Sequence, residues 1–187
     1  MDSTSDIDLM NMVKNGDLDK LGLLFERYHR RLFGFFYRLT WCRDSSEDLV
    51  QGVFERILKY RSSYTSNGEF STWIFSIARN HYHDYYRKNG SNVVEPKELD
   101  WDALPGEELQ ENDQSDEDCT QRLIRQALQQ LDTEKRQVLI LSRFEGLKYT
   151  EIAEVMNCTE GAVKVRVFRA LNELKGILTV LKKKEEI

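Results

Sequence analysis

The sequence contains few of the residues that mark specialised classes of protein. Its 187 residues include only two prolines and ten glycines, which excludes collagen-like and low-complexity chains. The three cysteines, Cys42, Cys119 and Cys158, are widely spaced without a CxxC pair, so neither a disulfide scaffold nor a zinc knuckle is indicated. No apolar run approaches the roughly 20 residues that span a bilayer, and the acidic N-terminus does not resemble a secretory signal. We therefore expect a cytoplasmic protein with reduced thiols and no membrane insertion.

Charge is distributed unevenly along the chain. The net charge is −3 for residues 1–20, +4 for 21–90, −10 for 91–120 and +4 for 121–187, which together give −5. The acidic stretch also holds both prolines, Pro96 and Pro105, and has few apolar residues, so it predicts an acidic flexible linker over residues 91–120. The blocks on either side, 1–90 and 121–187, are predicted to be two small domains, each with enough basic residues to bind phosphate.

Apolar spacing predicts helices in both blocks. In the first block, apolar residues recur three and four positions apart from Leu18 to Leu39, which predicts one helix. After a polar break the same spacing runs from Leu49 to Tyr60 and predicts a second helix, with Ser46 as its expected N-cap. A polar loop over 61–69 precedes a third helix that starts at Phe70. Because no useful alternation with a period of two occurs, we predict an all-α fold without a sheet.

The C-terminal block carries four further apolar stripes, and residues 149–171 have the pattern of a helix-turn-helix. A short helix is expected to end at Met156, and Thr159 is placed to cap the next helix. A projection at 100° per residue puts Val163, Val167 and Ala170 inside, with Val165 and Arg169 pointing outward between Lys164 and Arg166. Such a face is what reading of the major groove requires. The alternative is a structural helical hairpin with an ordinary solvated basic face.

The third helix of the first block also has a distinctive outer face. The same projection places aromatic, amide and basic residues opposite its apolar stripe: Thr72, Trp73, Ser76, Arg79, Asn80, His83, Tyr86 and Arg87. This composition suits phosphate contact and stacking on exposed bases. The alternative is that the aromatic side chains only pack against a neighbouring helix.

We predict that the protein is not an enzyme and has no metal or other cofactor. The many carboxylates between Glu107 and Asp118 lie in the predicted linker, where no framework fixes them as ligands. His81 and His83 lie about 200° apart around their helix and cannot chelate one ion. A free-standing helix-turn-helix transcriptional regulator is an alternative function, but it would leave the aromatic and basic face of the first block without a role.

Three strings, in this order and spacing around an acidic linker, resemble bacterial sigma factors of the sigma-70 superfamily, in the group called extracytoplasmic-function (ECF) sigma factors. They are the segment 48–51 (DLVQ) followed by Phe54, the segment 70–80 (FSTWIFSIARN), and the helix-turn-helix. The resemblance covers about residues 9–180. It implies two domains that bring core RNA polymerase to promoters, with the clamp helices and flap of the polymerase, promoter DNA and an anti-sigma factor as partners.

The resemblance also implies site residues. For core polymerase they are Asp48, Gln51, Phe54 and Glu55, next to Gly52, where the family often has an acid. For the −10 element they are Asn80 and the loop ending at Glu69, which would capture a flipped base and includes Ser62, Ser63, Tyr64, Asn67 and Gly68. The outer face projected above adds Trp73, Arg79, His83 and Arg87 to the expected −10 residues. For the −35 element they are Thr159, Lys164, Val165, Arg166, Phe168 and Arg169, with an apolar contact, such as one to a thymine methyl group, expected at Val165.

Overall fold

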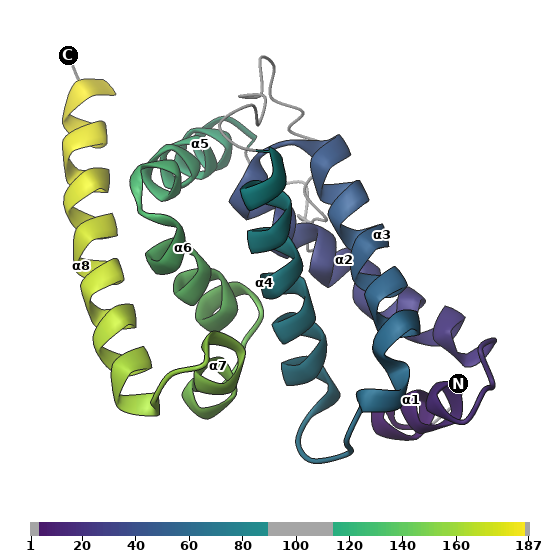
Figure 1. The fold of residues 1–187 in the computed structure, drawn as a ribbon. Coiled ribbons are helices and arrows are strands. Elements are labelled where there is room, and N and C mark those ends of the chain that lie inside the picture. Colours follow the sequence, from purple (N-terminus) through teal and green to yellow (C-terminus); the bar gives the residue numbers. More distant parts are fainter. Residues whose placement is uncertain (1–3, 90–113, 186–187) are drawn as a thin grey trace.

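A computed structural model describes residues 4–89 and 114–185, and within these two ranges the regular secondary structure is helical, without strands (Figure 1). The all-α prediction is confirmed. The elements are α1 (Asp6–Lys14), α2 (Lys20–Thr40), α3 (Arg43–Tyr60), the 3₁₀ turn η1 (Arg61–Ser63), α4 (Phe70–Asn89), α5 (Gln114–Gln130), α6 (Thr133–Leu139), the π-helical turn η4 (Ile140–Phe144), α7 (Tyr149–Met156) and α8 (Glu160–Glu185). Residues 91–113 of the predicted linker lie outside the described ranges.

The first domain consists of α1 to α4, with α2 packed against α1 and α3, and α3 against α4. The prediction that Ser46 caps α3 is wrong, because the helix begins at Arg43. Ser46 is buried inside the first turn, where its hydroxyl donates to the Cys42 carbonyl at 2.6 Å. The polar residues before Ser46, which suggested a break between helices, are thus helical themselves.

The α4 helix is covered on two sides. Phe70, Ile74 and Ala78 are buried as the apolar spacing predicts. Thr72, however, was predicted to point outward and is only 5% exposed, while Phe75 and Tyr82 are buried although they lie off the predicted stripe. Several elements surround α4: it packs against α3, contacts α1 and α2, with the Phe75 ring against Phe35 of α2, and also packs against α7 of the second domain.

The second domain consists of α5 to α8, with α8 packed against α5, α6 and α7 (Figure 1). The α5 helix begins at Gln114, inside the segment predicted to be linker, because residues 114–120 contain no proline or glycine to interrupt it. At the end of η4 the Glu145 amide donates to the Ile140 carbonyl, five residues back, at 3.0 Å, which is the wide π-type turn. Gly146, with φ 67°, then lets the chain change direction toward α7.

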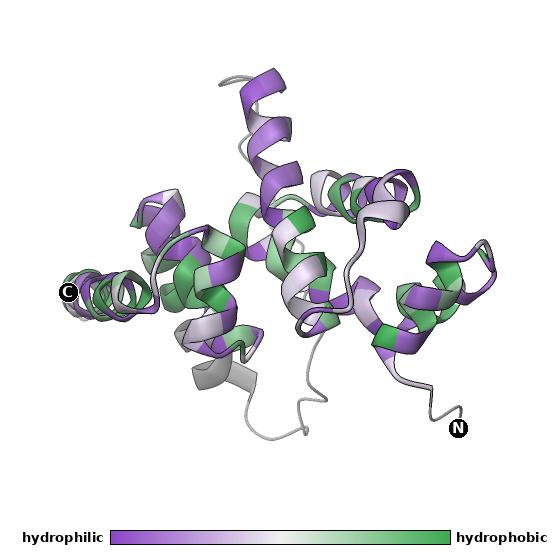
Figure 2. Ribbon diagram, turned by 60° about the horizontal axis from the view of Figure 1, so that its bottom comes forward, coloured by the Kyte–Doolittle hydropathy of each residue, from purple (hydrophilic) through white to green (hydrophobic). Residues whose placement is uncertain are grey.

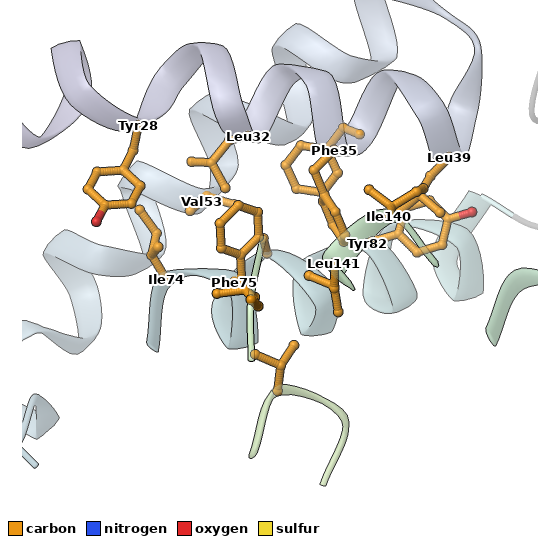
Figure 3. Packing of buried hydrophobic residues seen from close by; sticks show 14 of the residues in the cluster. Tyr28, Leu32, Phe35, Leu39, Val53, Ile74, Phe75, Tyr82, Ile140 and Leu141 are labelled. Carbon is orange, nitrogen blue, oxygen red and sulfur yellow. The ribbon is translucent and has the colours of Figure 1, made fainter. Parts of the chain in front are cut away.

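The two domains share one buried cluster. Each helix carries both hydrophilic and hydrophobic residues (Figure 2), and the hydrophobic ones meet between the helices. Figure 3 shows Phe35, Leu39 and Tyr82 of the first domain beside Ile140 and Leu141 of the second, and all five are buried. The domains predicted from the charge pattern are therefore in contact, which the sequence did not indicate. Within the described residues, no helix combines the length and the apolar content that crossing a bilayer requires.

Candidate nucleic-acid interface

The helix-turn-helix has the expected construction. The α7 helix ends at Met156, and Asn157 then adopts a left-handed conformation with φ 51°, which asparagine tolerates better than most residues. The Cys158 amide donates to the Ala153 carbonyl at 2.9 Å and closes the helix end. The Thr159 hydroxyl oxygen accepts from the Ala162 amide at 3.2 Å, so its predicted capping role is confirmed.

The predicted recognition surface lies on the outer side of α8. Val163, Val167 and Ala170 are buried, as the projection requires. Val165 is 48% exposed and Phe168 67% exposed, and Lys164 and Arg169 are also exposed. We call Lys164, Val165, Phe168 and Arg169 the recognition row. It combines two cations with two apolar side chains on one exposed face of a helix.

Two cations of α8 have acidic partners. The Lys164 ammonium pairs with Glu160 at 2.7 Å, one turn earlier, and this hydrogen bond raises its pKa. Arg166 is half-buried and its guanidinium lies 3.9 Å from the Glu134 carboxylate on α6. Arg166 therefore lies at the edge of the recognition row, and its guanidinium faces α6 of the same domain.

The loop before α4 is mostly exposed, but Tyr64 is not. Ser62, Ser63, Asn67 and Gly68 are all exposed. The prediction that Tyr64 contacts DNA does not fit the structure, because the residue is only 1% exposed and its ring packs against Phe70 and Trp73. Burial raises the pKa of the Tyr64 hydroxyl. Tyr64 thus anchors the loop, and the Lys14 ammonium holds the same point by donating to the Tyr64 carbonyl at 2.6 Å.

The predicted −10 residues of α4 differ in accessibility. Asn80 and Arg87 are exposed, and Trp73 is half-buried. Arg79 and His83 turn toward the second domain, where the Arg79 Nε donates to the Gln137 amide oxygen at 3.2 Å and the His83 ring lies 3.4 Å from the Gln137 amide nitrogen. Burial lowers the pKa of both side chains. The structure therefore separates the −10 residues of α4 into the exposed Asn80 and Arg87 and three half-buried residues, of which Arg79 and His83 contact the second domain.

On α3, Asp48, Gln51 and Glu55 are exposed, and the Gln51 amide donates to the Glu55 carboxylate at 3.1 Å. Phe54, predicted to bind polymerase, is only 7% exposed because Phe25 of α2 covers it, with 4.9 Å between the ring centroids. Phe25 itself is 43% exposed. The spacing along α2 could not have indicated this, because adjacent residues of the same helix, such as Phe35 and Phe36, are both buried.

Gly52 of α3 faces the side chain of His81 on α4. A Cβ atom at this position would stand 2.1 Å from Nε2 of His81. The imidazole therefore occupies the place of a side chain at position 52, and burial lowers the pKa of His81. This contact gives a structural reason for glycine where the family that the sequence resembles often has an acid.

Both domains match known families. Residues 24–92 match the family described as Sigma-70 region 2, and residues 121–174 match Sigma-70, region 4. The chain is 28% identical over 183 residues to the RNA polymerase sigma-H factor of Pseudomonas aeruginosa, covering 94% of this chain and 95% of the relative. It is 28% identical over 169 residues to the ECF RNA polymerase sigma-E factor of Haemophilus influenzae, covering 87% and 89%.

Solved structures agree with the sequence matches. The sigma factor RpoE of Bartonella quintana, solved in complex with the anti-sigma factor NepR, has a TM-score of 0.67 and 26% identity, covering 86% of this chain and 97% of that one. The free-standing regulator is not favoured, because both domains, and not only the helix-turn-helix, match sigma regions. The chain belongs to the sigma-70 family, in its ECF group, and is a sigma factor that directs RNA polymerase to promoters.

Proposed function

We propose that this sigma factor reads the −35 element with the recognition row of α8 and the −10 element with α4 and the loop before it. The observation that carries the proposal is the exposure of Lys164, Val165, Phe168 and Arg169 on one side of a helix whose other side is buried. The two cations would contact phosphates or guanine edges, and the two apolar side chains would contact thymine methyl groups. Thr159, at the start of the helix, and Arg166, at its edge, would contact the DNA backbone.

The −10 element would be opened by the first domain. Ser62 and Ser63 are exposed in η1, and Asn67 and Gly68 are exposed in the polar loop between two fixed points, the anchored Tyr64 and the start of α4. Such a loop suits capture of a flipped base, which costs a few kcal/mol of stacking that new protein contacts offset. Asn80 and Arg87 would be open to the same strand, whereas Arg79 and His83 are half-buried and each has one contact with Gln137.

Core polymerase would bind on α3 and the neighbouring part of α2. Asp48, Gln51 and Glu55 provide a polar exposed surface, and the half-exposed ring of Phe25 provides an apolar anchor over Phe54. An aromatic side chain next to charged groups is typical of the residues that dominate binding energies at interfaces. Phe54 would contribute indirectly, because its ring packs against the Phe25 ring.

The remaining roles follow from membership of the family. The protein would act in the bacterial cytoplasm, contact the clamp helices and flap of the polymerase, and carry out no chemistry of its own. An anti-sigma factor is a further expected partner, since the Bartonella quintana relative was solved with one. No cofactor is required for any of these roles.

The proposal is tested by in vitro transcription with core polymerase on a pool of randomised promoters. We expect the wild-type chain to select a promoter with two conserved elements. On that promoter, Arg169→Ala should reduce transcription about 5- to 150-fold, which corresponds to the ~1–3 kcal/mol of a base-reading arginine. Lys175→Ala is the matched control, because Lys175 is an exposed cation on the same helix beyond the recognition row. Selection of no promoter, or equal losses in both variants, would contradict the proposal.

A further inference from the structure

The loop before α4, residues 64–69, touches α1, the first helix of the chain. Figure 1 shows α1 next to the end of α3, and α1 contacts η1 and α4 as well as α2. The proposed function gives this loop the capture of a flipped base but gives α1 no role. The α1 helix also lies before residues 24–92, the segment that matches Sigma-70 region 2. What α1 contributes to the loop thus comes from outside the matched segment.

Two side chains of α1 hold two points of the loop. The Lys14 ammonium donates to the Tyr64 carbonyl at 2.6 Å, and the Ser66 hydroxyl donates to the Asn11 side-chain oxygen at 3.1 Å. Asn11 and Lys14 are three residues apart in the helix and therefore lie on the same side of it. That side of α1 faces the loop.

The loop has little else to fix its conformation between these points and α4. Residues 65–68 are all exposed, and in the described part of the chain their backbone groups form no hydrogen bond to another backbone group. Gly68, with φ 104°, adopts a left-handed conformation that glycine accepts more readily than other residues. A segment with few buried contacts and no backbone hydrogen bonds takes its conformation from the side chains that hold it. For this loop those side chains include Asn11 and Lys14.

The α1 helix is itself fixed on the first domain and therefore gives the loop a rigid support. Its inner side is buried at Leu9, Met10 and Val13. In its first turn the Asp6 carboxylate accepts from the Tyr28 hydroxyl at 2.6 Å and pairs with the Arg27 guanidinium, both on α2. The Tyr28 ring in turn stands edge-on to Phe70, the first residue of α4, with 5.1 Å between the centroids. Contacts that involve α1 thus reach both ends of the loop.

Direct contact with a DNA phosphate is the other role open to the Lys14 ammonium. Such a contact would strengthen binding to every sequence alike and would appear in the dependence of binding on salt. The geometry favours support of the loop, because the ammonium donates to a backbone carbonyl at the short distance of a charge-assisted hydrogen bond. The uncharged Asn11 contacts the same loop, which a role in phosphate binding does not explain.

We propose that Asn11 and Lys14 are positioning residues for the −10 element, which set the conformation of the loop before α4 and thereby the base that it prefers. This inference rests on the proposed function. Neither side chain touches the base, and both act through the loop residues that they hold. It follows that −10 selectivity depends in part on a helix that contributes no residue to the proposed DNA surface.

The experiment compares the full-length wild type with Asn11→Ala/Lys14→Met, which removes both contacts with the loop. The template is the promoter found in the transcription experiment, with its −10 element randomised, and selection uses core polymerase. At the captured position, the preference for the favoured base over the others should fall about 3- to 10-fold, as expected for the loss of a hydrogen bond in a folded protein. The −35 preference, measured in a second pool, and the helix content should not change, because α8 is unaltered.

Two comparison variants separate positioning from the general loss of a cation. Lys14→Arg keeps a cationic donor for the Tyr64 carbonyl and should retain the wild-type base preference. Asn15→Ala/Lys20→Met removes the same two kinds of side chain just after α1 and at the start of α2, where neither forms a hydrogen bond with the loop among the described residues. This control should also retain the wild-type preference.

NMR relaxation of the free chain measures the loop without DNA. The backbone order parameters of residues 65–68 should be near those of a rigid backbone, ~0.85, in the wild type and in Lys14→Arg. In Asn11→Ala/Lys14→Met they should fall below ~0.6, the range of flexible segments. If the double variant does not fold, Asn11→Ala and Lys14→Met are measured singly, and each should lower the same order parameters by a smaller amount.

Equal order parameters in the wild type and the double variant would overturn the support of the loop by α1. Lower order parameters with an unchanged base preference would overturn the link to −10 selectivity. An equal loss of binding on all sequences, with a smaller salt dependence, would overturn it as well and assign Lys14 to a phosphate. If the wild type selects no promoter, the proposed function and the link to −10 selectivity fail together, while the order parameters still decide whether α1 supports the loop.

Discussion

Replacement of Gly52 by alanine tests the contact between α3 and the His81 side chain of α4 in the first domain. Two effects of known size oppose each other. Alanine in a helix interior is about 1 kcal/mol more favourable than glycine. The new Cβ atom, however, would lie 2.1 Å from Nε2 and 2.8 Å from Cε1 of His81, so the imidazole has to move. Overpacking of this kind typically costs ~1–3 kcal/mol.

The expected net effect of Gly52→Ala is therefore a loss of about 0–2 kcal/mol in the free energy of unfolding. In a His81→Ala background the obstacle is gone, and the same substitution should stabilise the protein by about 1 kcal/mol. The reversal of sign between the two backgrounds is the prediction, and it does not depend on the cost of His81→Ala itself. Urea denaturation followed by circular dichroism measures all four chains.

Gly176→Ala provides the matched control. This glycine also lies inside a helix, α8, but a Cβ atom there would meet nothing within 4 Å. Its replacement should stabilise the protein in both backgrounds by the helix propensity alone. If Gly52→Ala stabilises the wild type as much as Gly176→Ala does, the imidazole moves aside without cost and the packing explanation of Gly52 is refuted.

Three further predictions concern the recognition row, the loop anchor and pH. Val165→Ser should change the preferred base pair at one −35 position without loss of helix content, because an apolar contact becomes a polar one; an unchanged preference in promoter selection would contradict this. Lys14→Met removes the charged donor to the Tyr64 carbonyl, worth ~1.5–3 kcal/mol, and should accelerate hydrogen exchange in the loop before α4; unchanged exchange would show that the Tyr64 ring alone anchors the loop. Because burial lowers the pKa of His81, the unfolded chain binds more protons below about pH 6.5, and stability is lost as pH falls through the native pKa. His81→Asn should therefore lose less unfolding free energy than the wild type between about pH 7.5 and about pH 5.5, and equal losses would exclude His81 as the cause.

Much of the local structure could be predicted from the sequence, because it depends on spacing within one helix. The inner face of α8, the turn at Asn157 and the cap at Thr159 all follow from residues three or four apart. The α1 helix was not predicted, although Ser5 accepts from the Asp8 amide and Leu9, Met10 and Val13 have helical spacing. Its apolar face is short, and its burial becomes evident only when α2 is in place.

The covered parts of the site could not be predicted, because they depend on contacts between distant segments. Tyr82 is buried beside Ile140 of the second domain, and no periodicity within α4 indicates this second covering (Figure 3). Likewise, Tyr64 appeared to belong to an open polar loop, and only the position of Phe70 and Trp73 shows that its ring turns inward. A helical projection assigns the buried and the exposed face correctly only where other elements cover a single side of the helix.

The π-helical turn η4 makes chain length a determinant of how this protein evolves. A π-type turn holds one residue more than the α-helical turn it replaces, and here it lies directly before Glu145. Loss of a single residue between Ile140 and Phe144 would restore α-helical pitch. Because the π-type turn already absorbs the additional residue, Glu145 and the chain after it would keep nearly the same direction relative to α6. Chain length at η4 can thus change by one residue in descendants of this gene while the helix-turn-helix keeps its sequence and its place.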